Sequence, residues 1–300
     1  MKHQITLRNL LKFMLIRGGE ILPDKLYLSW LYRLYTGNKL DWEAPITFTE
    51  KLQVLKLYVN NTPLCTRMAD KYHVREIISN TLGEEYLIPI LGVWNSFDEI
   101  NFTSLPNQFV LKTTHDSGGI VICKNKFQLN LHEAKKKLDS HIRENYFYRG
   151  REYQYRGIPP RIIAEQFMVD ESGTDLKDYK FFCFDGEPKV LFVASERFNG
   201  KGEPARFTYY DMDLNVLPFS SRGHKISENP LSEIPNFEEM KSCARILSKG
   251  FPHLRVDFYN INGKVYFGEL TFHHDGGLVP FEPHDWNVRL GQMIHLPDKK

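Results

Sequence analysis

The stretch that most constrains the fold lies near the carboxyl end of the chain, at residues 255–277. Polar and apolar residues alternate there around a short polar segment at 260–263, which is typical of a β-hairpin. Because strand side chains alternate between two faces, Asp257 can meet Glu269 and Thr271 on one face. Two adjacent carboxylates repel unless a cation lies between them, and hard oxygen donors select Mg²⁺ or Mn²⁺. The pattern indicates a metal site, although ordinary polar positions on a half-exposed hairpin would give it too.

The composition of the whole chain excludes one class of protein and fixes no other. Among its 300 residues, 39 Lys and Arg balance 37 Asp and Glu, which is not the charge of a general nucleic-acid binder. A chain of this length suits one large domain or two modest ones. The cysteines show no metal-ligand or redox spacing and are expected to be reduced thiols of a cytoplasmic protein; they are Cys65, Cys123, Cys183 and Cys243.

Residues 1–19 predict a basic amphipathic helix, because apolar positions recur at helical spacing and the only charged residues are four Lys and Arg. Arg8 and Lys12 interrupt the apolar run, which is not the pattern of a secretory signal peptide. No later stretch reaches the length that a bilayer requires. Two interpretations stay open: the helix makes a peripheral contact with the anionic inner face of a membrane, or it packs on its own domain.

Further helices are predicted along the next part of the chain. Residues 23–35 form one, and Thr47 with Glu50 has the capping-box spacing that predicts the start of another. Asp70 and Lys71 are expected in the first turn of a third, where the helix dipole favours the acid and gains nothing from the lysine. Lys71 is therefore either a ligand-binding residue or an ordinary solvated lysine.

Residues 109–123 have the layout of a strand, a polar glycine loop and a second strand. Lys112 lies inside the first, apolar strand, and an anion would explain it because an unpartnered buried lysine is costly. Gly118 and Gly119 would let the loop close over a phosphate with its backbone N–H groups. The loop matches neither the P-loop nor the dinucleotide fingerprint, and a plain hairpin with a two-glycine turn has nearly the same pattern.

The middle of the chain carries further charged groups on predicted strands. Residues 161–168 predict a strand that ends in a polar hinge, and residues 178–197 predict two strands joined by an Asp-Gly turn. Lys180 and Arg197 would each need a carboxylate or an anion nearby. In the next hairpin, residues 207–218, an Asp-Met-Asp bend is typical of a turn, although such a pair also holds metal-bound sugar nucleotides in glycosyltransferases.

Taken in order, these segments resemble the ATP-grasp superfamily, and within it the TupA-like branch of teichuronopeptide biosynthesis, which is found with bacterial surface-polysaccharide genes. The resemblance extends from about residue 23 to about residue 297. No single segment is specific, but their order and spacing are. The segments that carry it are Asp70 with Lys71, Lys112 with its glycine loop, residues 163–168, residues 178–180, and Asp257 with Glu269.

The resemblance implies an α+β fold of the ATP-grasp type, in which two α+β subdomains sandwich ATP behind a helical amino-terminal region. Residues 1–62 would form the helical region, and residues 63–107 a short segment before the ATP-grasp core. Residues 108–168 would form the small subdomain with the glycine loop, and residues 169–300 the large subdomain with the metal site.

The same resemblance implies roles for particular residues. ATP would be bound at its phosphates by the lysines and the loop, and at its adenine by the hinge; these residues are Lys71, Lys112, Ser117, Gly118, Gly119, Glu165, Gln166, Phe167 and Met168. The residues implied to be catalytic, as anion-binding groups, are Lys180, Arg197 and Arg255. Mg²⁺ or Mn²⁺ would be held by Asp257, Glu269 and Thr271.

Two departures from the family pattern lie beside the implied metal site. Family members commonly have Asn where this chain has Thr271, whose hydroxyl is a weaker ligand. Either water joins this hydroxyl to the metal, or a second metal site is poor. His273, His274 and Asp275 also differ from the usual small residues and proline, and they would either recognise substrate or fill a turn.

The implied reaction joins a carboxylate to an amine through an acyl phosphate, giving an amide without any side-chain nucleophile. By analogy the acid is a uronic acid of a surface-polysaccharide precursor, free or lipid-linked, and the amine is an amino acid. Two alternatives stay open. The first is a glycosyltransferase-type enzyme of the same pathway, and the second is a non-catalytic nucleotide-binding partner in a membrane-associated assembly. The sequence leaves the substrates and the oligomeric state open.

Overall fold

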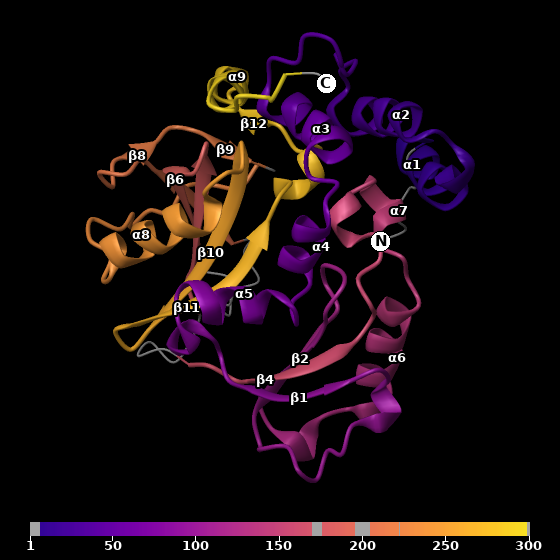
Figure 1. Cartoon of the computed structure of the whole chain (residues 1–300), viewed down its shortest axis with the longest axis vertical. Helices are drawn as coiled ribbons and strands as arrows, with labels where there is room; N and C mark the ends of the chain where they lie inside the picture. Colours follow the sequence, from indigo (N-terminus) through magenta and orange to yellow (C-terminus); the bar gives the residue numbers. More distant parts are fainter. Residues whose placement is uncertain (1–6, 170–175, 196–204, 222, 299–300) are drawn as a thin grey trace.

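The computed structural model describes residues 7–169, 176–195, 205–221 and 223–298. This part of the chain contains two larger antiparallel sheets, a two-stranded sheet of β9 and β12, and a helical amino-terminal region (Figure 1). The α-helices are α1 (Leu7–Gly18), α2 (Asp24–Thr36), α3 (Phe48–Tyr58), α4 (Pro63–Ala69), α5 (Val74–Thr81), α6 (Leu131–Ile142), α7 (Phe147–Gly150), α8 (Phe237–Ser248) and α9 (His284–Gln292). The strands are β1 (Ile90–Trp94), β2 (Phe109–Thr113), β3 (Ile120–Cys123), β4 (Ile162–Gln166), β5 (Asp178–Phe184), β6 (Glu187–Ser195), β7 (Arg206–Tyr210), β8 (Val216–Leu217), β9 (Ser220–Ser221), β10 (His253–Ile261), β11 (Lys264–Thr271) and β12 (Phe281–Glu282). This architecture confirms the expected α+β class.

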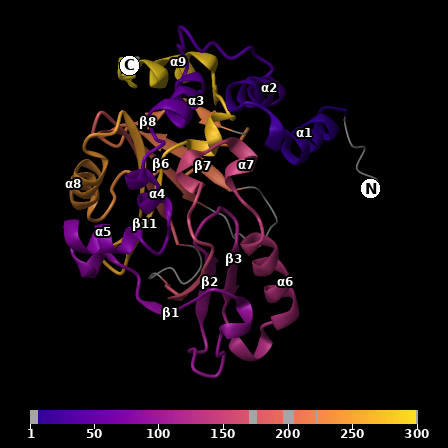
Figure 2. The ribbon, with the colours of Figure 1, turned by 45° about the vertical axis from the view of Figure 1, so that its right-hand side comes forward.

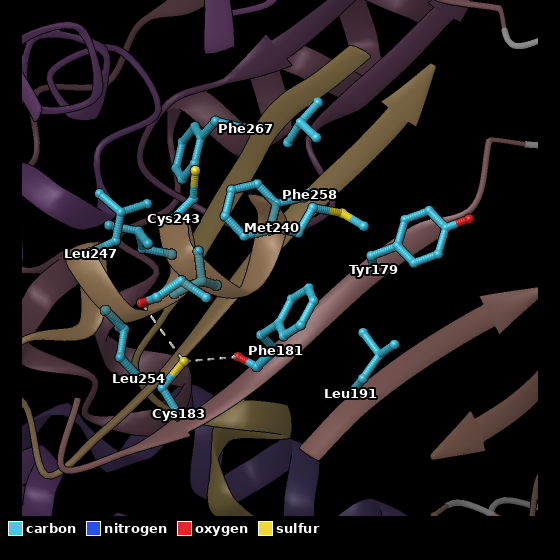
Figure 3. Close-up of a cluster of buried hydrophobic side chains, with 14 of the residues drawn as sticks. Tyr179, Phe181, Cys183, Leu191, Met240, Cys243, Leu247, Leu254, Phe258 and Phe267 are labelled. Atoms are coloured by element: carbon cyan, nitrogen blue, oxygen red, sulfur yellow. Dashed lines mark hydrogen bonds between the residues drawn. The ribbon is translucent and has the colours of Figure 1, made fainter. Parts of the chain in front are cut away.

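The large sheet has the strand order β11-β10-β5-β6-β7-β8, and neighbouring strands are antiparallel. Helix α8 covers one face, and α3 with α9 covers the other (Figure 1). On β5, Phe181 and Cys183 pack beneath α8, where the Cys183 Sγ lies 3.9 Å from the carbonyl oxygen of Ala244 (Figure 3). Phe182 points to the opposite face and meets Phe48 of α3. The central strands are therefore buried on both sides, and all four cysteines are free and buried, as expected.

The small sheet has the order β1-β4-β2-β3 and carries α6 on one face (Figures 1 and 2). Burial alternates along β2, so Phe109 and Leu111 pack toward Leu138 of α6 while Lys112 lies on the opposite face. Strand β1 comes from the segment 63–107, so this sheet takes up part of the chain that was expected to precede the small subdomain. The division of the chain by residue number otherwise stays a prediction.

The amino-terminal helices begin and pack largely as the sequence predicts. Helix α3 starts at a capping box, in which Thr47 Oγ1 accepts a hydrogen bond from Glu50 N at 3.3 Å and Glu50 Oε2 accepts one from Thr47 N at 2.9 Å. Helix α1 packs on α2 through Leu15 and Ile16. Within the described part of the chain, no helix is long and apolar enough to cross a membrane.

The predicted helix start at Asp70 was wrong. Asp70 and Lys71 lie in the turn between α4 and α5, and α5 begins at Val74. The carboxylate of Asp70 accepts hydrogen bonds from Tyr72 N at 2.9 Å and from His73 Nδ1 at 2.6 Å. The Asp70 carboxylate therefore stabilises the turn and does not cap a helix. The side chain of the adjacent Lys71 reaches the loop between β2 and β3.

The Asp-Met-Asp bend between β7 and β8 is held by its own first residue. Asp211 Oδ1 accepts hydrogen bonds from Asp213 N at 2.9 Å and Asn215 N at 2.8 Å, and Oδ2 accepts one from Asn215 Nδ2 at 2.9 Å. Both carboxylate oxygens are engaged by the turn, which favours the interpretation of this bend as a turn former.

Candidate active site

The carboxyl-terminal hairpin brings three charged residues into one row. Strands β10 and β11 meet at Asn262 and Gly263, whose φ angles of 52° and 76° suit the tight turn expected there. Asp257 pairs with Glu269 on β11 and with Lys180 on β5. Directly opposite residues on neighbouring strands share a face, so these side chains lie side by side on the large sheet.

A β-bulge at Gly268 sets this register. Phe267 pairs with Phe258, but the next residue of β10, Asp257, pairs with Glu269, so Gly268 is the extra residue. A Cβ at this position would lie 3.0 Å from the carbonyl oxygen of Asp257, so the close approach suits glycine. The bulge moves Glu269 to the face opposite to that of Phe267, which is buried in the core beneath α8.

Asp257 is buried and fully paired. Its Oδ2 accepts hydrogen bonds from Lys180 Nζ at 2.6 Å and Arg255 Nη2 at 2.7 Å, and its Oδ1 accepts one from Arg255 Nε at 2.7 Å. Burial lowers the pKa of Lys180, but the carboxylates of Asp257 and Asp178 outweigh it and raise that pKa above its ordinary value. The result is a charged cluster whose members depend on one another for compensation.

Glu269 joins this cluster but remains accessible, with 48% of its side chain exposed. Its Oε1 accepts hydrogen bonds from Arg255 Nη2 at 2.8 Å and from Thr271 Oγ1 at 3.0 Å. Burial opposes ionisation, yet Arg255 and Lys180 lower the pKa of Glu269 below its ordinary value. An ionised, reachable carboxylate therefore lies next to a buried one.

The donor set on these two strands fits a hard divalent cation. Asp257 and Glu269 offer carboxylate oxygens alone, which are ligands that Mg²⁺ prefers. Within the described residues, no three His, Cys, Asp or Glu side chains make a complete metal cage. Water, phosphate oxygens or the Thr271 hydroxyl would have to complete the coordination, as is usual for Mg²⁺ bound with a nucleotide.

On the small sheet, Lys112 and Glu165 form an ion pair, with Lys112 Nζ 2.5 Å from Glu165 Oε2. In the β2–β4 register Val110 lies opposite Glu165, so the lysine and the glutamate are diagonal neighbours on one face. Arg75 Nη1 lies 3.5 Å from Glu165 Oε1, and its Nη2 donates to the carbonyl oxygen of Ile88 at 2.8 Å. The strand lysine thus has a partner, as its burial requires.

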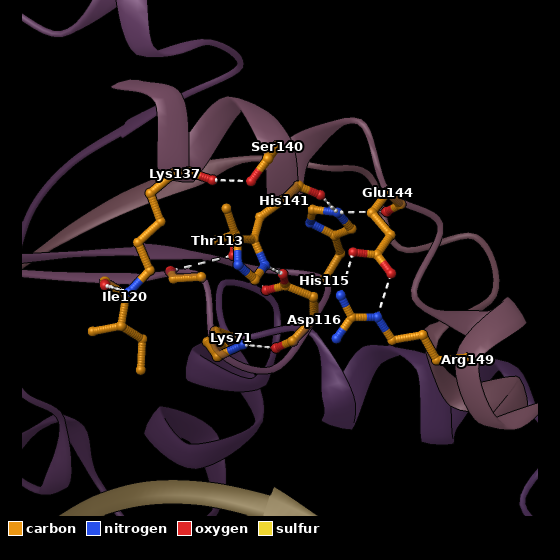
Figure 4. A network of polar contacts seen from close by, with 11 residues as sticks. Lys71, Thr113, His115, Asp116, Ile120, Lys137, Ser140, His141, Glu144 and Arg149 are labelled. Atoms are coloured by element: carbon orange, nitrogen blue, oxygen red, sulfur yellow. Dashed lines mark hydrogen bonds and ion pairs between the residues drawn. The ribbon is translucent and has the colours of Figure 1, made fainter. Parts of the chain in front are cut away.

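The glycine loop between β2 and β3 is organised around the buried carboxylate of Asp116 (Figure 4). Thr113 Oγ1 donates to Asp116 Oδ1, and His141 Nδ1 contacts Asp116 Oδ2. Lys71 holds the loop from the other side: its Nζ donates to the carbonyl oxygen of Asp116, and its backbone N–H donates to Thr114 O at 3.2 Å. Lys71 is therefore tied to the loop that the sequence associates with phosphate.

The two glycines of this loop have different physical requirements. Gly118 has a φ of +101°, which strongly favours glycine, whereas a Cβ on Gly119 would lie 1.8 Å from Thr113 Oγ1. Ser117 and Gly118 are exposed at the tip of the loop. The expected contact of this loop with phosphate stays a prediction.

One narrow pocket of about 30 Å³ joins the residues of the two sheets. Its lining residues are Met68, Ala69, Lys71, Val74, Arg75, Lys112, Tyr155, Glu165, Phe267, Gly268, Glu269 and Leu270. Two lysines and a glutamate expected at ATP thus face the same space as the expected metal-site Glu269. Burial lowers the pKa of Lys71, and the Asp116 and Glu269 carboxylates oppose that effect.

The remaining predicted residues lie around this pocket or outside the described chain. Gln166 ends β4, and its N–H donates to the carbonyl oxygen of Pro89 at 2.9 Å. Phe167 and Met168 follow the strand and are partly buried. Arg197 lies outside the described residues, so its expected role stays a prediction.

Arg75 and Tyr155 were given no role at the site from the sequence, and for His274 substrate recognition was one of two alternatives. Burial raises the pKa of Tyr155 well above its ordinary value, and the Glu152 and Glu269 carboxylates add to the effect. The crowding of Arg and Tyr at 149–156 was the only signal of this tyrosine in the sequence.

The two histidines that follow β11 are both buried and differ in their partners. His273 contacts Glu152 Oε2 from Nδ1 at 3.1 Å and Asn60 Nδ2 from Nε2 at 3.0 Å. His274 instead contacts Arg255, with its Nδ1 2.7 Å from Arg255 Nη1. Both histidines are buried at the start of the turn that follows β11, and the second lies directly against the charged cluster.

The small sheet carries the glycine loop and Lys112, Lys71 lies in a turn beside that loop, and the large sheet carries the paired carboxylates. This arrangement agrees with the ATP-grasp class of fold. The chain belongs to the TupA-like ATP-grasp family, whose model matches residues 50–295. No protein with a curated description matches the sequence.

Several solved structures are similar to this chain at low identity. The D-alanine–D-alanine ligase of Bacillus anthracis, complexed with ATP, has 14% identity and a TM-score of 0.42 over 76% of this chain and 63% of that one. The ATP-grasp ligase PsnB, complexed with minimal precursor, Mg and ADP, has 12% identity and a TM-score of 0.36 over 71% and 52%. A RimK domain protein of Sphaerobacter thermophilus has 12% identity and a TM-score of 0.41 over 77% and 67%. The chain thus spans less than two thirds of the first two structures.

Proposed function

We propose that this protein is an ATP- and Mg²⁺-dependent carboxylate–amine ligase that forms an amide through an acyl phosphate. The observation that carries the proposal is the shared pocket, in which Lys71 and Lys112 face Glu269 across the two sheets. Phosphoryl transfer depends mainly on positioning and on charge neutralisation, so lysines and a metal-binding carboxylate pair are the groups it needs.

The metal would be held by Asp257 and Glu269, with Thr271 as an indirect or weak ligand. When bound, Mg²⁺ supplies positive charge against the phosphate oxygens. In this structure Arg255 neutralises both carboxylates, since its Nη2 lies 2.7 Å from Asp257 Oδ2 and 2.8 Å from Glu269 Oε1. Arg255 is therefore held against the two carboxylates that would bind the metal.

Nucleotide entry requires the Lys112–Glu165 pair to open. The pocket between the sheets has a volume of about 30 Å³, so the paired side chains fill the space that a nucleotide would need. ATP phosphates would replace Glu165 as the partner of Lys112, and the freed carboxylate would lie beside the adenine, next to the hinge of Gln166, Phe167 and Met168. The loop of Ser117, Gly118 and Gly119 would close over the phosphates.

In the proposed reaction a carboxylate oxygen of the acid attacks the γ-phosphorus of ATP and ADP leaves. The amine nitrogen then attacks the acyl carbon, phosphate leaves, and the nitrogen loses a proton. Lys180 and Arg255, with Arg197 as a further candidate, would stabilise the negative charge on the acid and on the departing phosphate. Their guanidinium and ammonium groups already bind carboxylates in the described state.

For the substrates we propose a uronic acid of a bacterial surface-polysaccharide precursor, free or lipid-linked, and an amino acid as the amine. Family membership supports this choice, because the TupA-like family takes its name from teichuronopeptide biosynthesis. A reaction that consumes ATP and a precursor of this kind would take place in the cytoplasm.

The test is ADP release by the purified protein, with ATP and Mg²⁺, against a panel of uronic acids and amino acids. We expect ADP only when an acid and an amine are both present, and none in Glu269→Gln. The matched control is Glu238→Gln, which alters a 78% exposed side chain on α8, the helix that covers the other face of the large sheet. Consumption of a nucleotide sugar without ATP would favour the glycosyltransferase alternative, and ATP binding without turnover would favour a non-catalytic partner.

A further inference from the structure

Helices α1 and α2 lie outside the two larger sheets (Figures 1 and 2), and several of their apolar side chains are exposed. Leu11, Met14 and Trp30 are 40%, 49% and 50% exposed, and Ile21 in the connecting turn is 90% exposed. Between the helices lies an open groove of about 890 Å³, lined mostly by apolar side chains. We name Leu11, Met14, Ile21, Trp30 and this groove the α1–α2 surface.

Helix α1 already has a partner within the chain. Leu15 and Ile16 pack against the buried Tyr27, Leu28 and Leu31 of α2, and Leu15 also lines the groove. Helix α1 is therefore docked on α2, while Leu11 and Met14, which line the same groove, remain exposed. Exposed aromatic and aliphatic side chains gathered in this way mark a binding surface more often than single exposed residues do.

The charge of this part of the chain indicates which kind of surface it meets. Residues 1–40 contain seven Lys and Arg and two Asp and Glu, whereas the other 260 residues contain 32 and 35. The chain is nearly neutral overall, and its excess of positive over negative residues lies in the segment that carries the exposed apolar side chains. A strong charge asymmetry of this sign is typical of contact with an anionic surface.

We propose that the α1–α2 surface docks on an anionic lipid bilayer. A basic amphipathic helix lies in the plane of a membrane interface with its apolar side chains inserted, and a tryptophan such as Trp30 favours that depth. Arg33 lines the groove beside Trp30 and adds positive charge at its edge. The combination of apolar insertion and basic charge favours lipid over a second copy of the chain, whose matching surface would carry the same charge.

The surface is joined to the candidate active site by buried contacts. Arg151, which is 1% exposed, donates from Nη2 to the carbonyl oxygen of Gly19 at 2.5 Å and pairs with Asp24 Oδ1 at 2.7 Å. Tyr27 donates to the carbonyl oxygen of Tyr148 at 3.0 Å. The segment held in this way leads directly to Tyr155, which lines the pocket between the sheets. Docking would therefore place the pocket at a fixed distance from the membrane.

The test is co-sedimentation of the full chain with vesicles of phosphatidylcholine alone or of phosphatidylcholine with phosphatidylglycerol. We expect binding to the anionic vesicles, weak binding to the neutral ones, and a blue shift of tryptophan emission that Trp30→Phe removes. Met14→Glu should abolish binding, and Arg33→Gln should weaken it about fivefold, the effect of one basic charge near such a surface.

The matched control is Phe127→Glu, which alters a 90% exposed aromatic side chain on the small subdomain. It should bind vesicles as the unaltered protein does. The melting temperature of each variant shows whether the variant still folds, and so separates loss of docking from loss of folding. The shift of the melting temperature with ATP shows whether the variant still binds the nucleotide. Neither measurement requires the proposed reaction to take place. Absence of binding to anionic vesicles would overturn the proposal. An equal loss of vesicle binding in Phe127→Glu would also overturn it. A dimer seen by light scattering and abolished by Met14→Glu would overturn it too, because a second copy of the chain would then cover the surface.

Discussion

The Nη1 of Arg255 lies 2.7 Å from the Nδ1 of His274, while its Nη2 contacts both Asp257 and Glu269. A guanidinium only donates, so His274 accepts at Nδ1 and carries its hydrogen on Nε2. Burial lowers the pKa of His274 to about 4, and the positive charge of Arg255 works in the same direction. A neutral histidine therefore holds the arginine of the proposed active site in place.

Removing this acceptor should weaken catalysis more than binding. His274→Leu leaves a guanidinium N–H unpaired in a buried site, which costs about 1–3 kcal/mol and corresponds to a loss of about fivefold to 150-fold in kcat. His274→Asn keeps an acceptor near the position of Nδ1 and should retain most of the activity. Steady-state kinetics with varied ATP and acid would check this, and equal losses in both variants would show that the ring has only a packing role.

The two carboxylates of the proposed metal site should differ in their effect on stability. Asp257→Asn removes the buried charge between Lys180 and Arg255, and loss of one partner of a buried ion pair costs about 3–5 kcal/mol. Glu269→Gln alters a half-exposed carboxylate, so its effect on the free energy of unfolding should stay within about 1 kcal/mol. Urea unfolding without metal measures both values. Both variants should lose Mg²⁺-dependent ADP release, and equal destabilisation would contradict the burial of Asp257.

Gly119→Ala should damage the glycine loop. The new Cβ would lie 1.8 Å from Thr113 Oγ1 and 3.1 Å from Asp116 Oδ1, so the loop must shift. Crowding of this kind costs about 1–3 kcal/mol, and we expect the rise in melting temperature caused by ATP to be lost or much reduced. Gly18→Ala is the control, because a Cβ there meets nothing within 4 Å. An unchanged ATP response in Gly119→Ala would exclude the loop from the nucleotide site.

Local chemistry explains which parts of this structure could be predicted from the sequence. Thr47 and Glu50 form their capping box within four residues, and the turn at Asn262 and Gly263 follows from two residues that tolerate positive φ. The apolar positions along the last hairpin also show where its regular alternation is interrupted. Val265 and Phe267 are buried in the core beneath α8, and after Gly268 the buried residues become Leu270 and Phe272. That change of phase at a glycine is the sequence signal of the bulge.

The contacts that complete the site could not be predicted in the same way. Arg75 meets Glu165 across 90 residues, and Arg255 meets His274 across a bulge and a turn. Such pairs depend on how helices and sheets pack, which no local pattern encodes. The misplaced helix start at Asp70 has a related cause, since its carboxylate can bind the N–H groups of a turn as readily as those of a helix.

Stability should fall in acid because of His253. Burial lowers the pKa of this histidine to about 3; His274, His273 and Arg255 add to that effect, and the hydrogen bond to the Cys183 carbonyl oxygen opposes it. The unfolded chain binds this proton below about pH 6.5, whereas the folded chain does not until about pH 3. The contribution of His253 to the free energy of unfolding is therefore fully present above about pH 6.5 and is lost as the pH falls toward 3.

Between pH 7 and pH 5 this single group should remove about 2 kcal/mol from the free energy of unfolding. Urea unfolding at both pH values measures the loss, and His253→Gln, which keeps a donor but does not titrate, should show a loss smaller by about that amount. His295→Gln is the control, because that histidine side chain is 77% exposed. The same pH dependence in His253→Gln and the unaltered protein would assign the effect to other groups.

Thr271→Asn should strengthen the metal site. The Thr271 hydroxyl donates to Glu269 Oε1 at 3.0 Å, so it is engaged with a metal-site carboxylate and offers at most one weak oxygen donor. An asparagine at this position could present its amide oxygen on the same face of β11, and neutral carbonyl oxygens are good ligands for hard cations. We expect half-maximal ADP release, or half-maximal stabilisation by ATP, at a Mg²⁺ concentration lowered by about tenfold, which corresponds to about 1.4 kcal/mol from one added ligand. Thr271→Val, which has the same shape but no hydroxyl, should need more Mg²⁺ if the threonine binds metal directly or through water. If Thr271→Asn and Thr271→Val both need the same Mg²⁺ concentration as the unaltered protein, residue 271 does not bind the metal. Asp257 and Glu269 would then be the two protein ligands of the proposed site.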